Sequence, residues 1–200
     1  VLKHTGYKII YGSYASTDVY YRKPLTFHTC NPQAPATSFV MVNDIHGDNK
    51  LLEDLMSRCN LTQTDFVLFN GDMLSFINSE DQLFKGFMDT AVRLFASEIP
   101  MYYARGNHET RGVFATEIQR YFSPCQEHLY YAFRQGPVYC IVLDTGEDKP
   151  DSDIEYAGIT QYDLYRTEQS EWLASILEST EYKEAPFKII VAHIPPAVTE

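Results

Sequence analysis

Four short segments of the sequence carry side chains that bind metal ions. They read Asn-Asp-Ile-His-Gly-Asp at 43–48, Asn-Gly-Asp at 70–72, Arg-Gly-Asn-His-Glu at 105–109 and Ala-His at 192–193. Each segment follows an apolar run, so we expect all four at the carboxyl ends of neighbouring strands, where open α/β sheets bind ligands. Borderline divalent ions take imidazole and carboxylate ligands together. The four segments therefore predict a metal site at one edge of a sheet.

The spacing within these segments suggests how two ions share the ligands. Asp44 and His46 are two residues apart, so in extended backbone both side chains point the same way and can bind one ion. Ions of a two-metal site lie roughly 3.5–4 Å apart and need a bridging ligand, a role that suits the single carboxylate Asp72 after its glycine. Asn107, a neutral oxygen donor, and His193, an imidazole donor, are expected to bind the second ion.

Each of these residues also has an ordinary structural interpretation. Asp44 can cap a turn, and Asp72 can be an Asx-turn residue, which is the commoner role of a single aspartate. Taken together and in order, the residues favour a metal site. For Asp48 and Glu109 a helix-dipole partner remains an equal alternative. Three other histidines belong to no motif, and we expect structural roles for them: His4, His28 and His128.

The ordered set D-x-H, G-D, G-N-H-E and a later strand-terminal His resembles the calcineurin-like metallophosphoesterase superfamily. This superfamily includes Ser/Thr phosphoprotein phosphatases, purple acid phosphatases and metal-dependent nucleases. The resemblance covers about residues 36–200. It implies an α/β fold, the calcineurin-like αββα sandwich with two β-sheets flanked by helices. It also implies two metal ions, of Mn, Fe or Zn, and hydrolysis of phosphate esters by a metal-bridging hydroxide.

The resemblance assigns further roles around the metal ligands. It implies that His108 protonates the leaving alkoxide or stabilises its charge. Asn107, Arg105 and Arg111 are predicted to contact the substrate phosphate, the two arginines bidentately. The expected substrate is a phosphomonoester, either a small molecule or a phosphoprotein. Two alternatives stay open: a phosphodiesterase or nuclease of the same fold, and a domain that binds metal or a phospho-ligand without turnover.

Two departures from the family pattern qualify these expectations. Family members carry a Gly-His-x-His motif that gives each metal one more imidazole, and the residues after His193 do not contain it. We therefore expect a truncated domain that binds metal weakly and has weak phosphatase activity or none. Ser75 stands where purple acid phosphatases have Tyr and Ser/Thr phosphatases have Asp, so neither tyrosinate chemistry nor an Asp partner for His108 is indicated.

Apolar patterning predicts the elements that position these residues. We expect strands at 38–43, 65–70, 101–104 and 187–192, and a hairpin in which 129–133 pairs with 138–144 across Gln135-Gly136. A long helix is expected over 83–95, ending before Pro100. A short helix should bury Leu51, Leu52, Leu55 and Met56, and a helix capped by Thr167 should carry Trp172, Leu173, Ile176 and Leu177.

The amino-terminal part predicts a separate unit. The β-rich runs 7–14 and 19–29 indicate a hairpin, and the Pro-rich segment 31–36 indicates a linker. We therefore expect residues 1–35 to be a hairpin and linker, and residues 36–200 the catalytic domain. The hairpin resembles the last strands of the fibronectin-like domain that precedes the catalytic domain in some secreted relatives. A secreted or periplasmic location is favoured on this ground, whereas the oligomeric state is not indicated.

The composition of the chain limits the classes of partner that we expect for it. The formal net charge of −11 and the absence of a visible basic face argue against nucleic acid as the main partner. The 200 residues contain no signal peptide and no run of 18 apolar residues, so they show neither an export signal nor a membrane span. The acidic segment 147–155 is expected to be a solvated surface loop, with an active-site rim or an extra cation site as the alternative. Cys59 and Cys140 are expected in the core, and a bridge from Cys125 to Cys140 stays open.

Overall fold

The computed structural model describes residues 25–122 and 128–195. Its six strands are β1 Phe39–Val42, β2 Phe66–Asn70, β3 Met101–Ala104, β4 Tyr131–Gln135, β5 Val138–Val142 and β6 Phe187–Val191. Its α-helices are α1 Asn49–Met56, α2 Glu80–Leu83, α3 Asp89–Ala91, α4 Gln119–Phe122, α5 Tyr162–Leu177 and α6 Thr180–Glu184. The predicted strands are confirmed, with their ends shifted by one or two residues.

The strands form two sheets of three. In the first sheet β2 lies between β1 and β3, and all three strands are parallel. In the second sheet β5 lies in the middle, antiparallel to β4 and parallel to β6. The predicted hairpin is β4–β5, and it turns at Gly136 with a left-handed φ of +53°. Because β1, β2 and β3 are parallel, their carboxyl ends meet at one edge, which brings three of the four motif segments together.

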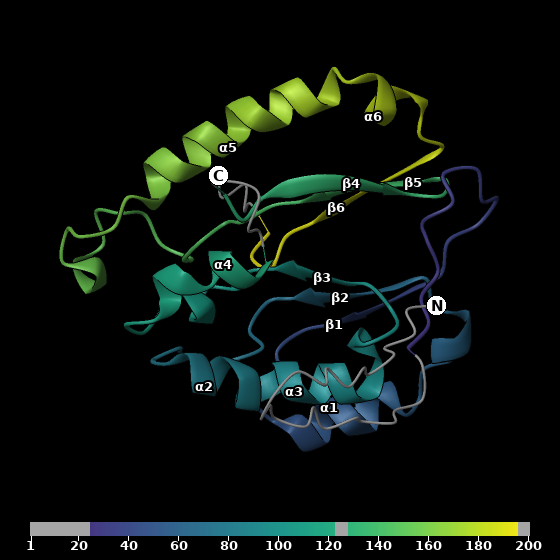
Figure 1. Ribbon diagram of the computed structural model, residues 1–200. Helices are drawn as coiled ribbons and strands as arrows, with labels where there is room; N and C mark the ends of the chain where they lie inside the picture. Colours follow the sequence, from purple (N-terminus) through teal and green to yellow (C-terminus); the bar gives the residue numbers. More distant parts are fainter. Residues whose placement is uncertain (1–24, 123–127, 196–200) are drawn as a thin grey trace, which may run out of the picture.

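Three apolar layers hold the two sheets and their helices together (Figure 1). Between the sheets, Phe66 and Leu68 of β2 pack against Val138, Cys140 and Val142 of β5. A second layer lies between the first sheet and the helices α1 to α3, and a third lies between the second sheet and α5 and α6. The order helix, sheet, sheet, helix is the αββα sandwich predicted from the sequence.

The long predicted helix is present but is not a regular α-helix. Two wider π-helical turns, Phe84–Met88 and Val92–Ala96, alternate with α2 and α3. In an α-helix, residues four apart step round the axis by about 40°, whereas π turns bring such residues back toward one line. The buried apolar residues of this segment recur every four positions: Leu83, Phe87, Ala91 and Phe95. The π turns therefore keep one apolar line against the first sheet.

The predicted cap of α5 was wrong. The helix begins at Tyr162, and Thr167 lies inside it, donating its hydroxyl to the carbonyl of Asp163. The amides of Tyr162 and Asp163 donate instead to the carboxylate of Asp151, a residue eleven positions before the helix begins. A distant carboxylate supplies the acceptor that a local Ser or Thr usually provides, so the local sequence pattern did not show it.

The acidic segment 147–155 also differs from the prediction of a solvated loop. Its middle is largely exposed, but Glu147 is buried, with 7% of its surface exposed, and Asp151 caps α5. The reason is that each of these carboxylates meets hydrogen-bond donors from outside its own loop, which compensate for lost solvation. The alternative of an active-site rim holds for Glu147, as its contacts below show.

Other predictions fall partly or wholly outside the described residues. The first run of the proposed hairpin lies in residues 1–24, and the described end of the second run, 25–29, is not a strand. Cys125 is likewise outside the described part, while Cys140 is a buried free thiol and Cys59 is half-buried. Of the four residues predicted to be buried by α1, only Leu52 and Met56 are buried. The chain at 31–36 is irregular, and the linker assignment stays a prediction.

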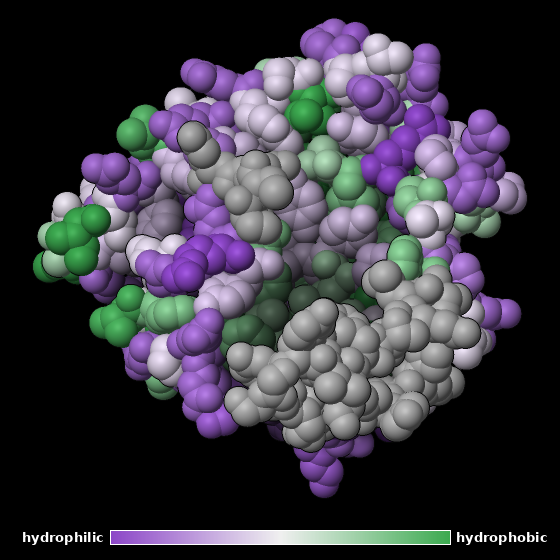
Figure 2. All heavy atoms as spheres, in the orientation of Figure 1, coloured by the Kyte–Doolittle hydropathy of each residue, from purple (hydrophilic) through white to green (hydrophobic). Residues whose placement is uncertain are grey.

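Hydrophilic side chains dominate the described surface on the face seen in Figure 2, with scattered apolar groups among them. Ile154 and Ile159, 92% and 85% exposed, are the most exposed large apolar residues of the loop before α5. No helix among the described residues has both the length and the apolar content needed to cross a bilayer.

Candidate metal centre

The loops after β1 and β2 run side by side and are joined through their backbones. The amide of Asp44 donates to the carbonyl of Gly71, and the amide of His46 donates to the carbonyl of Asp72, at 3.1 and 3.0 Å. The amide of Gly47 donates to the carbonyl of Met73. These bonds continue the pairing of β1 with β2 beyond the strands, so the Asp-x-His segment is held in register with Asp72.

The glycines of two motifs make close approaches that no other residue permits. A Cβ on Gly71 would lie 2.6 Å from the Cα of Gly106 and 2.6 Å from the ring of His193. A Cβ on Gly106 would lie 2.2 Å from Oδ1 of Asp72 and 2.4 Å from its backbone nitrogen. The two glycines therefore let the ends of β2 and β3 touch, which brings Asp72 against the Asn107-His108 turn.

Glu109 joins the same loops from the inside. Its carboxylate is completely buried and accepts hydrogen bonds from the amides of Asp72, Leu74 and Gly106, at 2.8–2.9 Å. Burial raises the pKa of the Glu109 carboxyl above its usual value, and the three amides act in the opposite direction. Glu109 is thus neither a ligand nor a helix-dipole partner; it fixes the backbone around Asp72.

Three of the candidate ligands have left-handed backbone. The φ angles of Asp44, His46 and Asp72 are +57°, +48° and +53°. Among the described non-glycine residues, only Ala157 shares this conformation. Such backbone costs on the order of 1 kcal/mol per residue and occurs mainly at functional sites. The surrounding hydrogen bonds hold these residues in a conformation that turns their side chains toward one another.

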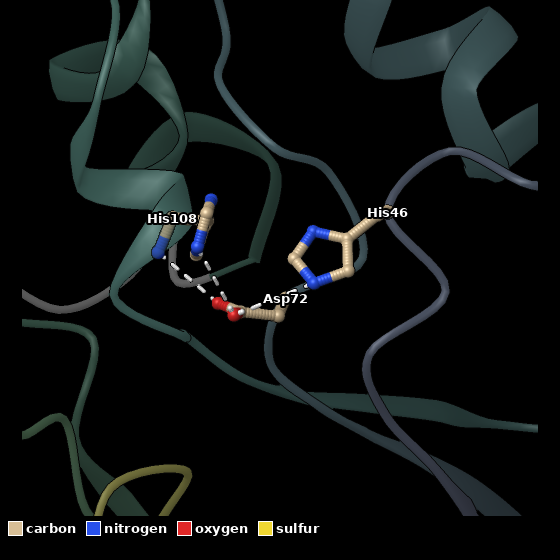
Figure 3. Close-up of side chains that lie close together, drawn as sticks. All are labelled: His46, Asp72 and His108. Atoms are coloured by element: carbon tan, nitrogen blue, oxygen red, sulfur yellow. Dashed lines mark hydrogen bonds and ion pairs between the residues drawn. The ribbon is translucent and has the colours of Figure 1, made fainter.

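Asp72 is the centre of the site. Its carboxylate is 5% exposed, and Oδ2 lies 3.8 Å from Nε2 of His46, 3.8 Å from Nε2 of His108 and 3.4 Å from Nε2 of His193. The other oxygen, Oδ1, accepts the backbone amide of His108 at 3.0 Å. Figure 3 shows this carboxylate pointing between the rings of His46 and His108. Burial alone would raise the pKa of Asp72, but hydrogen bonds from His193 and His108 outweigh it and lower the pKa.

Two groups of potential metal ligands share this carboxylate. One is Asp44, Asp72 and His193, and the other is His46, Asp72 and His108; within each group the donor atoms lie within 4.8 Å of one another. The sequence pairs Asp44 with His46, and Nε2 of His46 lies 3.9 Å from Oδ1 of Asp44. These two side chains meet through a left-handed turn rather than the extended backbone expected. Asp72 belongs to both groups, as a bridging ligand would, and the division of the other ligands between two ions stays a prediction.

Second hydrogen bonds orient two of the histidines. Nδ1 of His193 lies 2.7 Å from the carbonyl oxygen of Asn70, which leaves Nε2 facing Asp72. The contact with Asp72 raises the pKa of His193 to about 9 in the metal-free protein. Nδ1 of His108 lies 3.0 Å from the carbonyl oxygen of Ser75. The partner that orients His108 is therefore a backbone carbonyl, which no side-chain motif indicates.

The side chains predicted to contact substrate have partners within the protein. Arg111 forms two hydrogen bonds with Glu147, Nε to Oε1 at 2.8 Å and Nη2 to Oε2 at 2.9 Å, and its Nη1 lies 3.2 Å from Nε2 of His108. Asn107 donates its amide nitrogen to Glu147 at 3.4 Å. Arg105 is paired with the buried carboxylate of Asp144, Nη2 to Oδ2 at 2.8 Å. Arg111 thus lies beside His108, while Arg105 is engaged elsewhere.

The chain matches the calcineurin-like phosphoesterase family over residues 37–199. It belongs to this family. Among solved structures, it resembles a purple acid phosphatase, PPD1 from yellow lupin (Lupinus luteus) seeds, with a TM-score of 0.58 and 18% sequence identity. That similarity covers 80% of this chain and 31% of the lupin protein, so the chain spans less than a third of the neighbour, and at this identity the likeness shows the fold alone. No curated protein shows significant similarity to the chain.

The residues of this calcineurin-like phosphoesterase fit metal ions by their chemistry. The two groups of donors together contain two carboxylates and three imidazoles, and both groups include Asp72. Borderline divalent ions prefer these ligand types. The family is metal-dependent. His128, in contrast, stacks on Tyr130 and joins neither group, and Asp48 accepts the amide of Leu51 as the cap of α1, so both have structural roles.

Sequence reasoning missed Asp144 as a site residue and placed Glu147 at the site only as the less favoured alternative for its segment. Both belong to Leu-Asp-Thr-Gly-Glu at 143–147, which directly follows β5. A strand-terminal acidic segment with a glycine is the same signal that drew attention to the other loops. It was overlooked because the acidic residues that follow made the whole stretch look like a solvated loop.

Proposed function

We propose that this protein hydrolyses phosphate monoesters with the help of two bound metal ions. One observation supports this most directly: the buried carboxylate of Asp72 is shared by two groups of metal ligands, and an oriented histidine, His108, stands beside it. A shared carboxylate is the feature that two-metal hydrolases need. The family match agrees with phosphoester hydrolysis in general, and the preference for monoesters is part of the proposal.

Bound ions would supply Lewis acidity that acidifies water and offsets the charge of the phosphoryl oxygens. Asp72, Asp44 and His193 would hold one ion, and Asp72 and His46 would hold the other. Asn107 is a further candidate ligand, on the ground of the sequence motif. We assign the remaining imidazole, His108, to the proton. Its Nδ1–H donates to the carbonyl of Ser75, so the ring presents Nε2 on the side of Asp72. As an imidazolium, it can give the Nε2 proton to the leaving alkoxide.

Arg111 provides the positive group for substrate. Its Nη1 lies beside the His108 ring while the rest of the guanidinium is held by Glu147. A phosphate that occupies the space near His108 would therefore meet a cationic donor. The net charge of −11 makes a nucleic-acid backbone an unfavourable substrate, and we propose small-molecule or protein phosphate esters instead.

Hydrolysis of p-nitrophenyl phosphate and of its bis ester, with Mn²⁺ or Zn²⁺ in excess, tests this function. We expect the monoester to be hydrolysed faster, and Asp72→Ala to lower both metal content and turnover, because the variant removes the shared ligand. Faster hydrolysis of the bis ester would identify a diesterase. Full metal content in Asp72→Ala would exclude its bridging role, and metal binding without turnover would leave only a binding domain.

The role of His108 needs a separate variant, because the ring also lies within reach of the second metal group. We expect His108→Ala to lower kcat about 10²- to 10⁴-fold while metal content stays normal. His128→Ala, which removes a histidine stacked on Tyr130, is the matched control and should leave kcat unchanged. Loss of one metal equivalent in His108→Ala would make His108 a ligand rather than the acid.

A further inference from the structure

Glu147 is a buried carboxylate in the loop after β5, on the second sheet, yet its contacts are with the motif loop of the first sheet. Oε1 accepts Nε of Arg111 at 2.8 Å and the hydroxyl of Thr110 at 3.0 Å. Oε2 accepts Nη2 of Arg111 at 2.9 Å and the amide nitrogen of Asn107 at 3.4 Å. A single carboxylate thus holds three side chains from the five residues that follow Gly106.

The contact with Arg111 fixes the direction of its guanidinium. Both donors on the Nε–Nη2 edge are taken by the carboxylate, in the bidentate geometry that Arg and carboxylate favour. The remaining nitrogen, Nη1, lies 3.2–3.3 Å from the two ring nitrogens of His108. Glu147 therefore leaves one edge of the guanidinium turned toward the place where a substrate phosphate and its leaving oxygen would meet His108.

The contact with Asn107 fixes which end of its amide is available. The side-chain amide is planar, with a donor nitrogen and an acceptor oxygen on opposite sides. Because Nδ2 donates to Glu147, Oδ1 is directed away from that carboxylate. An amide can bind a metal ion only through its oxygen. The same carboxylate that holds Arg111 thus selects the amide orientation that a ligand role for Asn107 requires.

From these contacts we propose that Glu147 is a positioning residue, which orients Arg111 for the substrate phosphate and Asn107 for the metal. The inference rests on the proposed phosphatase function. Pairing with Arg111 also explains how a carboxylate can be buried at the rim of an anion site: the pair is neutral, and the guanidinium keeps one edge for the substrate.

The role of Glu147 toward Arg111 is tested first, in an experiment that we call the phosphate arm. It is a double-mutant cycle on the Mn²⁺-loaded protein, in which affinity for inorganic phosphate is measured by calorimetry. We expect Glu147→Gln and Arg111→Ala each to weaken phosphate binding about tenfold, the loss of one charge-assisted hydrogen bond. The double variant should be no weaker than Arg111→Ala alone, because Glu147 acts through Arg111. Glu155→Gln is the matched control: it removes another carboxylate of the same segment, paired with Lys149, and should leave phosphate binding unchanged.

The metal arm measures Mn²⁺ affinity without turnover or phosphate. We expect Glu147→Gln to weaken it about tenfold, as loss of a residue that orients a metal ligand does, and Glu147→Asp to have a smaller effect because it keeps the charge. Wild-type Mn²⁺ affinity in Glu147→Gln would overturn the role toward Asn107. Additive effects in the phosphate cycle, or an equal effect of Glu155→Gln, would overturn the role toward Arg111. A wild-type protein that binds Mn²⁺ and phosphate but hydrolyses no ester would overturn the proposed function, and both arms would still decide the role of Glu147.

Discussion

The loops after β2 and β3 and the loop after β5 contribute to the site in different ways. In the first two, the contacts are made by backbone: Gly71 and Gly106 touch, and the buried carboxylate of Glu109 gathers three amides. In the loop after β5, side chains make the contacts. Asp144 holds Arg105 and the hydroxyl of Tyr165, and Glu147 holds Arg111.

This difference explains which parts of the site a sequence motif reveals. A turn that is held by backbone contacts needs glycine and one particular carboxylate, so it appears in the sequence as a short motif of fixed spacing. A side chain that reaches across from another sheet needs only a charge at the right place, and many sequences satisfy that. In the loops held by backbone contacts, small substitutions should therefore lower the stability of the protein strongly. In the loop held by side chains, stability should depend on the charge of the carboxylates and hence on pH.

The largest effect should come from Gly106→Ala. The added Cβ would lie 2.2 Å from Oδ1 of Asp72. This carboxylate cannot move without breaking its bond from the His108 amide, and the Asp72 backbone cannot move without breaking its bond to Glu109. We expect a loss of about 3 kcal/mol in the free energy of unfolding of the metal-free protein, measured in urea. Gly158→Ala is the control: nothing lies within 4 Å, so only the strain of its positive φ, about 1 kcal/mol, should appear. Equal losses would mean that the contact of the two loops is not tight.

An intermediate effect is expected for Glu109→Gln. The variant keeps the shape but places an N–H₂ group against a backbone amide that needs an acceptor. Leaving a buried donor unsatisfied should cost about 2 kcal/mol in the free energy of unfolding. Glu53→Gln removes an exposed carboxylate that pairs with Arg93 and should change stability by less than about 0.5 kcal/mol. If both variants unfold at the same urea concentration, the carboxylate of Glu109 does not hold the loops.

The smallest effect, and the one most dependent on pH, should come from Asp151→Asn in the loop held by side chains. Desolvation favours a higher pKa for Asp151, but hydrogen bonds from Thr160 and from the amides of Asp163 and Tyr162 outweigh it and lower the pKa below its ordinary value of 3.8. A lowered pKa in the folded state adds stability above the ordinary value, and this is lost as pH falls through the lowered one. The wild type should therefore unfold at a higher temperature than Asp151→Asn near pH 6, and the gap should close toward pH 3. A gap that stays constant with pH would mean that the carboxylate charge is not involved.

Several features of this protein followed from the sequence alone. The alternation of apolar runs and turn residues predicted the strands, and four strand-terminal segments predicted the gathering of Asp44, His46, Asp72 and His193. Both depend on local rules: side chains alternate along a strand, and parallel strands end at one edge. The shared position of Asp72 in both ligand groups also followed, because one carboxylate stood alone after a glycine.

The tertiary structure decided the backbone that turns these residues toward one another and the groups that orient them. Left-handed turns at Asp44 and His46 bring Nε2 of His46 to 3.9 Å from Oδ1 of Asp44, and the carbonyl of Ser75 takes the place of an acidic partner for His108. Glu147 and Asp151 each act on residues at least ten positions away or on another sheet. Such contacts depend on how two sheets and a distant helix pack together. Local patterns report only the conformation of neighbouring residues, so the partners of a carboxylate across the molecule became visible only in the folded chain.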